Sequence, residues 1–342
     1  MDVKTLGIDL GKNVFHVVGL DERGAVALKR RVTRTQLAVL VGNLPRCLVG
    51  MEACPGSHHM ARRLEAHGHT VRLLPPQYVR PYVKTNKNDF RDAEAIAEAV
   101  GRGTMRFVTP KTVAQLDLQA LHRVRARWVR HRTALGNQIR AFLLEQGRPI
   151  RPGRGALRGE LRRLLAADAP GISPSLARLL THLLEEWQQL EERIDRVTGE
   201  ITAVATADPA CQRLMAVPGV GPLSATALVA SVGNGSAFSK GRDFAAWLGL
   251  VPRQHSTGGI PRLLGVSKCG NRYLRRLVVL GAQSVRRSKV RDRQRFGPWL
   301  QRLELRVHRN VAVVALANKL ARIAWSVLAN ATPYRPLIDE AA

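Results

Sequence analysis

The chain has 342 residues, and its 54 lysines and arginines against 26 aspartates and glutamates give a formal net charge of +28. Hydrophobic residues make up 45% of the sequence, which excludes a largely disordered chain, and the length of 342 residues suggests about two or three domains. A positive charge of this size predicts a polyanionic partner, and nucleic acid is the first choice.

An anionic membrane is the alternative partner. The N-terminus lacks a basic segment followed by an apolar one, so we expect no secretory signal. The apolar run at 311–328 is interrupted by Asn318, Lys319 and Arg322, which predicts an amphipathic helix and not a membrane span. The four cysteines form no Cys-x-x-Cys zinc clamp, and sparse cysteine favours a reducing compartment. We therefore expect a cytoplasmic, nucleoid-associated protein with no membrane partner.

The first part of the chain has the pattern of alternating strands and helices. Short apolar strands at 3–9 and 14–20 and a third that begins at 25 predict an antiparallel meander, because 21–24 provides turn residues. Further strands are expected at 47–52 and 70–74, and helices at 36–42, 58–67 and 89–101. The sequence predicts an α/β domain over 1–110.

The middle of the chain is predicted to form long helices over 111–207. Arginines crowd the polar faces of the first helix, at 113–146, and a loop rich in proline, glycine and arginine follows at 148–155. From Leu176 to Val204 the apolar residues alternate steps of four and three for about four heptads. This strict repeat favours a coiled coil, and the alternative is a long helix that packs within its own domain.

Carboxylates are scarce in this chain, so their positions are informative. Asp9 ends the first predicted strand, and Glu52 ends the strand at 47–52. Sites in α/β sheets form where strands end, so neighbouring parallel strands would place these two acids side by side. Asp89 and Asp92 lie three residues apart at the start of a helix and therefore share one of its faces. We expect that helix to bring them to the same edge of the sheet.

Converging carboxylates repel one another unless a divalent cation lies among them, and oxygen ligands alone suit Mg²⁺ or Mn²⁺. Two such ions can hold both sides of a phosphodiester during cleavage. The ordinary alternative is that Asp89 or Asp92 stabilises a helix N-terminus and that Asp9 belongs to a turn. Each acid alone is best explained structurally, whereas the four together favour a catalytic metal site.

This arrangement resembles the N-terminal domain of the DEDD insertion-sequence transposases, which have a RuvC-like, RNase H-type fold. The resemblance rests on GIDLGK at 7–12, on Glu52 at a strand end and on KNDFRDA at 87–93. It implies that the catalytic, metal-binding residues are Asp9, Glu52, Asp89 and Asp92. Lys87, at the start of the last motif, is predicted to bind nucleic acid.

The last part of the chain, 208–342, is predicted to be mainly helical, with an amphipathic helix at 307–328. The segment VPGVGP at 217–222, followed by a helix at 225–232, has the pattern of a helix–hairpin–helix motif. Its turn, with Gly219 and Gly221, would direct backbone N–H groups at a phosphate without reading bases. The alternative is a tight turn between two helices.

A second C-terminal motif places Ser256 and Thr257 directly before two glycines. Basic residues around it would hold a phosphate and stabilise the charge that develops during attack, namely Arg253, Arg262, Lys268, Arg272 and Arg275. A serine positioned against a phosphate can act as a nucleophile, although a lone serine beside glycines is more often a turn residue. His255 is adjacent in sequence, but adjacent side chains need not meet, so the general base is not assigned.

These motifs resemble the C-terminal domain of the same transposase family, in which a serine attacks DNA and forms a phosphoserine link. The resemblance rests on PRQHSTGG at 252–259 and GVSKCGNRYLR at 265–275. Many relatives carry two serines before the glycines, whereas Ser256-Thr257 here leaves Ser256 as the catalytic nucleophile. Cys269 stands where a basic residue is expected, which puts a phosphate contact at that position in doubt.

Together the two resemblances imply a DNA transposase or site-specific recombinase of a mobile element. Its expected partners are donor and target DNA and an element-encoded bridge RNA, whose base pairing reads sequence while the protein reads shape and backbone. A dimer or tetramer is expected through the coiled coil, with the acids and the serine of one site supplied by different subunits. The alternatives are a RuvC-like, metal-dependent Holliday-junction nuclease and a non-catalytic nucleic-acid-binding protein.

Overall fold

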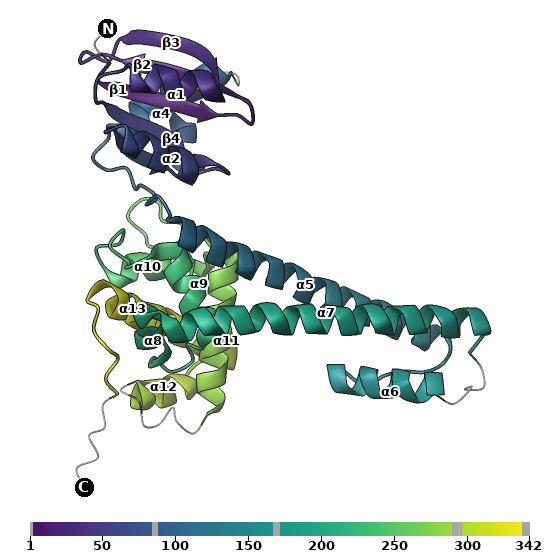
Figure 1. The fold of residues 1–342 in the computed structure, drawn as a ribbon. Coiled ribbons are helices and arrows are strands. Elements are labelled where there is room, and N and C mark those ends of the chain that lie inside the picture. Colours follow the sequence, from purple (N-terminus) through teal and green to yellow (C-terminus); the bar gives the residue numbers. More distant parts are fainter. Residues whose placement is uncertain (1–2, 84–87, 167–171, 289–293, 295, 337–342) are drawn as a thin grey trace. The chain divides into compact units, whose positions relative to one another are not determined.

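The computed structural model describes residues 3–83, 88–166, 172–288, 294 and 296–336 (Figure 1). Contacts divide the chain into two compact units, Met1–Val113 and Ala114–Ala342. The helical region predicted at 111–207 and the C-terminal domain predicted at 208–342 therefore share the second unit almost entirely. The proposed division into three domains stays a prediction.

The first unit is built on a five-stranded mixed sheet with the order β3-β2-β1-β4-β5. The predicted antiparallel meander is present, since β2 pairs antiparallel with both β1 and β3. On the other side β1, β4 and β5 run parallel, as expected for the strands that carry Asp9 and Glu52. The strands are β1 (Thr5–Leu10), β2 (Val14–Leu20), β3 (Val26–Thr33), β4 (Leu48–Glu52) and β5 (Thr70–Leu74).

Helices cover both faces of this sheet, because its central strands are apolar on both sides. Helices α1 (Arg34–Gly42) and α2 (Ser57–Ala66) close a core that includes Leu6, Ile8 and Met51. The opposite face, with Val18 and Leu20, packs on α4 (Asp89–Val100). Two short elements, α3 (Pro76–Val79) and η1 (Arg80–Tyr82), lie between β5 and α4 in the chain and were not predicted.

Helix α4 approaches the sheet unusually closely over Gly7 and Gly50. A Cβ atom on Gly7 would lie 2.0 Å from the Ala93 carbonyl oxygen, and one on Gly50 would lie 2.8 Å from the Val100 side chain. Since real Cβ atoms do not approach other atoms this closely, any larger residue would push α4 away from β1 and β4. The two glycines therefore set the height of α4 above the sheet.

In the second unit two long helices, α5 (Val113–Glu145) and α7 (Pro174–Ala207), lie side by side and antiparallel (Figure 1). The direction follows from their contacts, because Arg125 bonds Thr198 at 2.7 Å while Gly136, further along α5, packs on Trp187. The shorter α6 (Arg154–Ala166) completes this helical bundle. The loop predicted at 148–155 precedes it, and no separate helix was predicted for these residues.

Most residues of the four-three repeat of α7 pack against other helices of the same chain. Leu180, Trp187 and Leu190 are buried against residues of α5 and α6, and Ile194 and Ile201 are buried as well. The repeat thus matches the alternative interpretation, a long helix packed on its own domain, and these side chains are not exposed for a partner subunit. The coiled coil as an intermolecular contact is not supported.

The rest of the second unit is a mainly helical bundle around one core. The last long helix, α13, packs against α8, α10, α11 and α12 and has nine buried residues. It is apolar enough to span a membrane by composition, but half of that stretch is buried in this core. The helices are α8 (Pro209–Met215), α9 (Pro222–Val232), α10 (Gly241–Trp247), α11 (Arg272–Arg287), α12 (Gly297–Glu304) and α13 (Arg309–Ala329).

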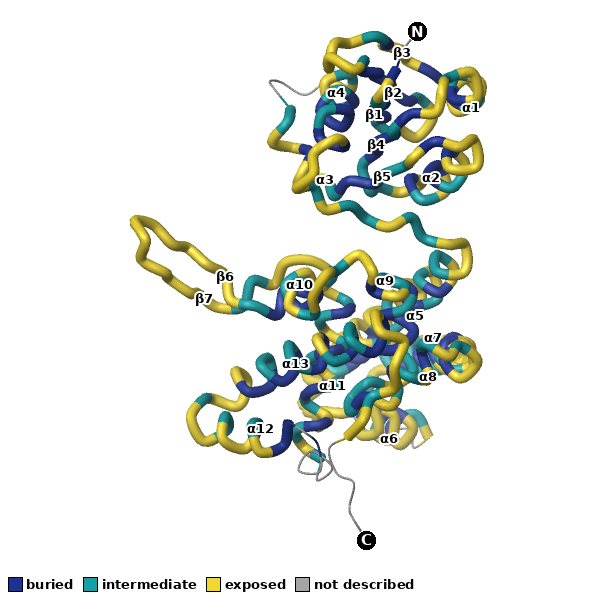
Figure 2. The backbone as a smooth tube through the Cα atoms, turned by 90° about the vertical axis from the view of Figure 1, so that its left-hand side faces the viewer, coloured by how far each residue is buried: buried dark blue, intermediate teal, exposed yellow. Residues whose placement is uncertain are grey.

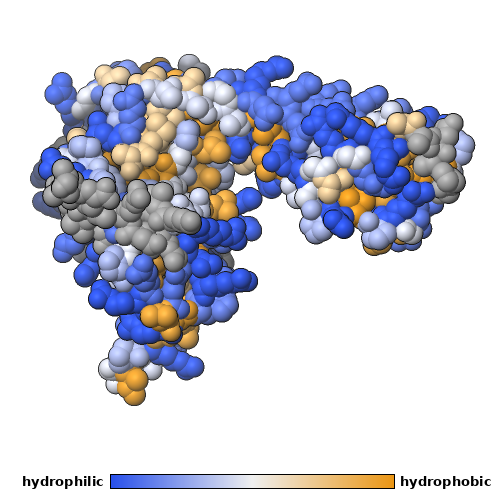
Figure 3. Space-filling model, turned by 90° about the horizontal axis from the view of Figure 1, so that it is seen from below, coloured by the Kyte–Doolittle hydropathy of each residue, from blue (hydrophilic) through white to orange (hydrophobic). Residues whose placement is uncertain are grey.

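One element of this unit is not helical. Strands β6 (Pro252–Gln254) and β7 (Leu263–Val266) form an exposed antiparallel hairpin that projects from the bundle (Figure 2). The sequence identified the motifs of this region but did not predict a hairpin. Figure 3 shows one face of the molecule, on which hydrophilic side chains are abundant and apolar areas lie between them.

Candidate functional site

The acids predicted from the two parallel strands lie at one edge of the sheet. Strand β1 pairs with β4 so that Ile8 is opposite Met51, and Asp9 and Glu52 are the next residues of each strand. Both acids follow a glycine by two positions, and Gly7 and Gly50 face α4. Because side chains alternate along a strand, Asp9 and Glu52 also face α4.

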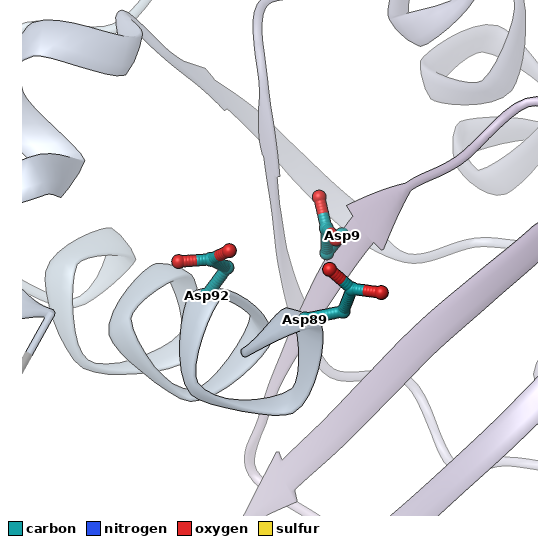
Figure 4. A group of neighbouring side chains, drawn as sticks. All are labelled: Asp9, Asp89 and Asp92. Carbon is teal, nitrogen blue, oxygen red and sulfur yellow. The ribbon is translucent and has the colours of Figure 1, made fainter. Parts of the chain in front are cut away.

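Helix α4 supplies the other two acids from its first turn. Figure 4 shows Asp89 and Asp92 on the helix beside Asp9 at the end of its strand. One oxygen of each carboxylate lies within 4.8 Å of the others. Asp9 and Asp92 are half-buried and Asp89 is exposed. The structure thus brings three predicted acids into one cluster.

Glu52 lies beside this cluster, outside the 4.8 Å group. Burial raises the pKa of Glu52, and the negative charges of Asp9 and Asp92 raise the pKa further. A carboxyl group whose ionisation is opposed in this way gains from a nearby cation.

The cluster suits a small divalent cation. Ligand oxygens on opposite sides of a bound Mg²⁺ are about 4.2 Å apart, and oxygens of the three carboxylates lie within 4.8 Å of one another. The Asn88 side-chain oxygen accepts a hydrogen bond from the Phe90 N–H at 2.9 Å and so caps α4. The helix start therefore has its cap without Asp89 or Asp92.

Sequence reasoning missed His16 as a neighbour of the acids. It lies opposite Asp9 in the β1–β2 register, and its Nδ1 is 3.5 Å from an oxygen of Asp89. Its ring packs edge-on against Phe90, with the ring centres 4.7 Å apart. The sequence did carry a signal for this residue, because His16 lies on the second predicted strand, one short turn after Asp9. A hairpin register between the two strands would have placed His16 beside Asp9.

Ser256 lies in the second unit, near the tip of the β6–β7 hairpin. The tip is a tight turn in which the Ile260 N–H donates to the Thr257 carbonyl at 3.0 Å. Gly258 and Gly259 have φ of +56° and +76°, a conformation that glycine adopts without steric cost. The two glycines are therefore explained by the turn, which presents Ser256 in an exposed position beside it.

Two donors point at the Ser256 hydroxyl oxygen. The Gln254 side-chain amide donates to Oγ at 2.9 Å, and the Arg262 backbone N–H donates at 3.3 Å. Both bonds leave the hydroxyl hydrogen available, and both would stabilise negative charge on Oγ when that hydrogen leaves. Gln254 is a second residue that the sequence argument did not identify. The hydroxyl has no described hydrogen bond to His255.

The predicted phosphate-binding cations have different surroundings. Four have exposed side chains, namely Arg253, Arg262, Lys268 and Arg272. Arg275 is instead engaged with the backbone, because its Nη1 donates to the carbonyl of Leu248 at 2.9 Å and to that of Cys269 at 2.6 Å. It braces the loop before α11. Lys87 lies outside the described residues.

The segment around Gly219 and Gly221 joins α8 to α9, which pack on each other. Gly219 has φ of +79°, and a Cβ atom there would lie 2.6 Å from the Gly281 carbonyl oxygen of α11. Close packing on α11 explains this glycine without a ligand. Gly221 precedes α9 as its cap residue and has open space around it. A phosphate contact at this turn stays a prediction.

Comparisons with known proteins find relatives for both the N-terminal and the C-terminal part of the chain. Residues 6–147 match a DEDD transposase family model described as "Transposase", and residues 211–297 match "Transposase IS116/IS110/IS902 family". A probable family 20 transposase of Pseudomonas aeruginosa is 47% identical over 98% of this chain and 100% of its own length. The transposase for insertion sequence element IS1328 of Yersinia enterocolitica is 43% identical over 97% and 99%. That for element IS1111A of Coxiella burnetii is 45% identical over 98% and 92%.

Proposed function

The chain belongs to the IS116/IS110/IS902 family of transposases, and from that premise we propose that it recombines DNA through a phosphoserine formed by Ser256, assisted by a divalent-metal site at the acid cluster. Transposition of DNA is the activity of the family. The observation that carries the proposal is the convergence of Asp9, Asp89 and Asp92 in a chain that also exposes Ser256.

The acid cluster would hold Mg²⁺ or Mn²⁺. Asp9, Asp89 and Asp92 offer ligand oxygens, and Glu52 would join them as a bound cation favours its ionised form. A bound ion supplies polarisation of a phosphate oxygen. The residues themselves orient the site, because α4 is held against β1 by close backbone packing at Gly7. The acids would thereby position the scissile phosphate.

Ser256 would be the nucleophile. Its Oγ forms a bond to phosphorus, one bridging P–O bond of the DNA strand breaks, the serine proton passes to a base, and the leaving oxygen takes up a proton. Gln254 and the Arg262 N–H would stabilise the charge on Oγ during attack. Because the phosphodiester energy is retained in the Ser–O–P bond, rejoining needs no nucleotide cofactor.

The same cations would hold the phosphate during this step. Arg253 and Arg262 flank Ser256 in the hairpin, and Lys268 and Arg272 follow β7; all four are exposed. Among the described residues none of the four has a carboxylate within ion-pair distance, and exposed cations of this kind neutralise a phosphate at low desolvation cost. Arg275 would act indirectly, by bracing the loop that carries Lys268.

A structured RNA encoded by the element is the proposed guide. On α5 the side chains of Arg123, Arg127 and Arg130 are exposed, whereas Arg125 and Arg132 contact α7. The exposed set would bind a nucleic-acid backbone without reading sequence. The specificity would then come from base pairing. Sequencing the RNA that copurifies with the protein from bacterial cells, where such elements reside, tests this proposal.

We also propose a homo-oligomer with composite sites, in which the acids of one subunit act with the serine of another. Since most of the α7 repeat is buried within the chain, other surfaces would form the contact. Complementation tests it: Asp9→Ala and Ser256→Ala proteins, each inactive alone, should restore recombination when mixed. If the mixture stays inactive while a wild-type and Ser256→Ala mixture is active, the composite site is wrong.

The central experiment is a denaturing gel of the protein incubated with labelled donor DNA, RNA and Mg²⁺. We expect a covalent protein–DNA adduct that Ser256→Ala abolishes, while the matched variant Ser267→Ala, in which a second serine of the same region is changed, leaves it intact. Cleavage that survives Ser256→Ala but not Asp9→Ala would instead identify a metal-dependent nuclease. DNA binding without cleavage in any variant would identify a non-catalytic binding protein.

A further inference from the structure

A large groove lies at the base of the serine hairpin, in the second unit. Its volume is about 1180 Å³, above the range typical of small-molecule sites. One wall is a face of α13 on which the residues follow steps of three and four from Val311 to Ser326. The other walls come from α10, α12 and the hairpin, including Pro252, Leu264 and Val266.

The groove combines an apolar floor with a basic rim. Val314 and Ile323 of α13 and Leu264 of the hairpin contribute apolar surface, and Leu264 is 40% exposed. Two tryptophans, Trp299 and Trp325, also line it. These apolar groups remain in contact with water unless a ligand covers them.

The rim carries cations and no described carboxylate. Lys240, Arg242 and Arg322 line the groove, and no carboxylate of the described residues lies within ion-pair distance of them. Lys319 lies over the Trp299 ring, 4.4 Å from its centre. The Trp325 indole N–H donates to the Gly235 carbonyl at 3.1 Å, which fixes that ring in the wall. The electrostatics therefore favour an anionic ligand with flat apolar parts.

We propose that this groove binds an unpaired stretch of the DNA strand that Ser256 attacks, with its bases on the apolar floor and its phosphates at the rim. Unpaired bases stack on aromatic and apolar side chains, whereas a duplex hides its bases and offers mainly phosphates. An anionic bilayer is disfavoured as the ligand. The solvent-facing apolar side of α13 forms the wall of a hollow, and it does not protrude in the way that insertion into a membrane surface requires.

The choice of DNA rests on the proposed function of Ser256. Pro252 lines the groove and lies four residues before Ser256 on the same strand and turn, a distance of about 13 Å for extended chain. A strand held in the groove would thus continue within a few nucleotides to the serine. The hairpin would then serve as the wall of the binding site and as the carrier of the nucleophile.

The test compares two changes in the groove with matched controls elsewhere in the same unit. Arg242→Ala/Arg322→Ala removes two exposed rim cations, and Arg178→Ala/Arg193→Ala removes two exposed arginines of α7. Val311→Glu adds a negative charge to a residue that is 54% exposed in the first turn of α13, where an acid favours the helix. Leu305→Glu, at a site 87% exposed and outside the groove, is its control.

Binding is measured by fluorescence anisotropy with a labelled single-stranded DNA, the same strand as RNA, the same DNA as a duplex, and vesicles containing anionic lipid. We expect both groove variants to weaken single-stranded DNA binding about tenfold, duplex binding much less, and vesicle binding not at all, with the salt slope of the double variant reduced by about two. The controls should bind single-stranded DNA within about twofold of wild type.

Equal losses on single strand and duplex would overturn the proposal, as would a loss confined to RNA or to vesicles. Photocrosslinking of an iodouracil-substituted strand gives an independent location, since crosslinks should map to Trp299 or Trp325 and disappear in Val311→Glu. All these measurements are repeated in Ser256→Ala. If Ser256→Ala binds DNA in the groove but the wild-type protein forms no adduct, the serine mechanism is wrong and the groove assignment stands. If the groove variants still form the adduct and bind DNA as tightly as wild type, the groove assignment is wrong and the serine mechanism stands.

Discussion

Gly7→Ala should disturb the spacing of the acid cluster, although residue 7 is not one of the acids. The added Cβ atom would lie 2.0 Å from the Ala93 carbonyl oxygen and 2.6 Å from the Ala97 nitrogen. Both are backbone atoms of α4, so no side chain can rotate to relieve the clash. To reach even 3.0 Å, the helix or the strand must move by about 1 Å.

Two effects follow from that displacement. Overpacking of this kind costs about 2 kcal/mol of unfolding free energy, which for a unit of this size lowers the melting temperature by about 10 °C. Since Asp89 and Asp92 are carried by α4 and Asp9 by β1, the same movement changes the spacing of the carboxylates. A displacement of about 1 Å in a catalytic site can reduce the rate about 100-fold.

The assay combines thermal unfolding of the full-length protein with the DNA adduct gel at several Mg²⁺ concentrations. Gly42→Ala is the control, because it lies at the end of α1 in the same unit with nothing within 4 Å of an added Cβ atom. It should leave both readouts near wild type. If Gly7→Ala melts and reacts like the control, the close packing of α4 on β1 is not what positions the acids.

Three further outcomes are expected. Burial lowers the pKa of His122 to about 4, and the charge of Arg125 adds to the shift. As pH falls below 6.5 the unfolded state therefore binds a proton before the folded state does, and stability declines toward pH 4. Urea unfolding should show a loss of about 2 kcal/mol of unfolding free energy between pH 7.5 and pH 5, and this loss should be smaller in His122→Gln. Gln254→Leu should slow formation of the Ser256 adduct about tenfold without changing DNA affinity, and an unchanged single-turnover rate would contradict the role given to its amide. Arg275→Met should lower unfolding free energy by about 2 kcal/mol, whereas Arg276→Met, at an exposed neighbour, should not.

Several features followed from sequence because they depend on local pattern. The alternation of apolar residues and the turn at 21–24 were enough for the meander, and the helical spacing of apolar residues was enough for α4. The parallel neighbours β1 and β4 followed from the rule that sites form at strand ends. These predictions succeeded since backbone propensity and tertiary packing favoured the same structure.

Other features depended on partners distant in sequence. The repeat of α7 has the same four-three spacing whether its apolar side is covered by another chain or by α5 and α6, so periodicity could not distinguish the two. His16 became a neighbour of Asp89 only through the hairpin register and the position of α4.

The sequence by itself determined the charge, the four acids, the serine motif and, through them, the family. Those are properties of residue type and spacing, and they do not require the chain to be folded. Only the tertiary structure decided that α4 rests directly on Gly7, that two donors point at Ser256, and that α13 leaves one face open beside the hairpin. The first and the last depend on how close segments distant in sequence come, which packing sets. The two contacts of Ser256 are local in sequence and depend on the conformation of the hairpin.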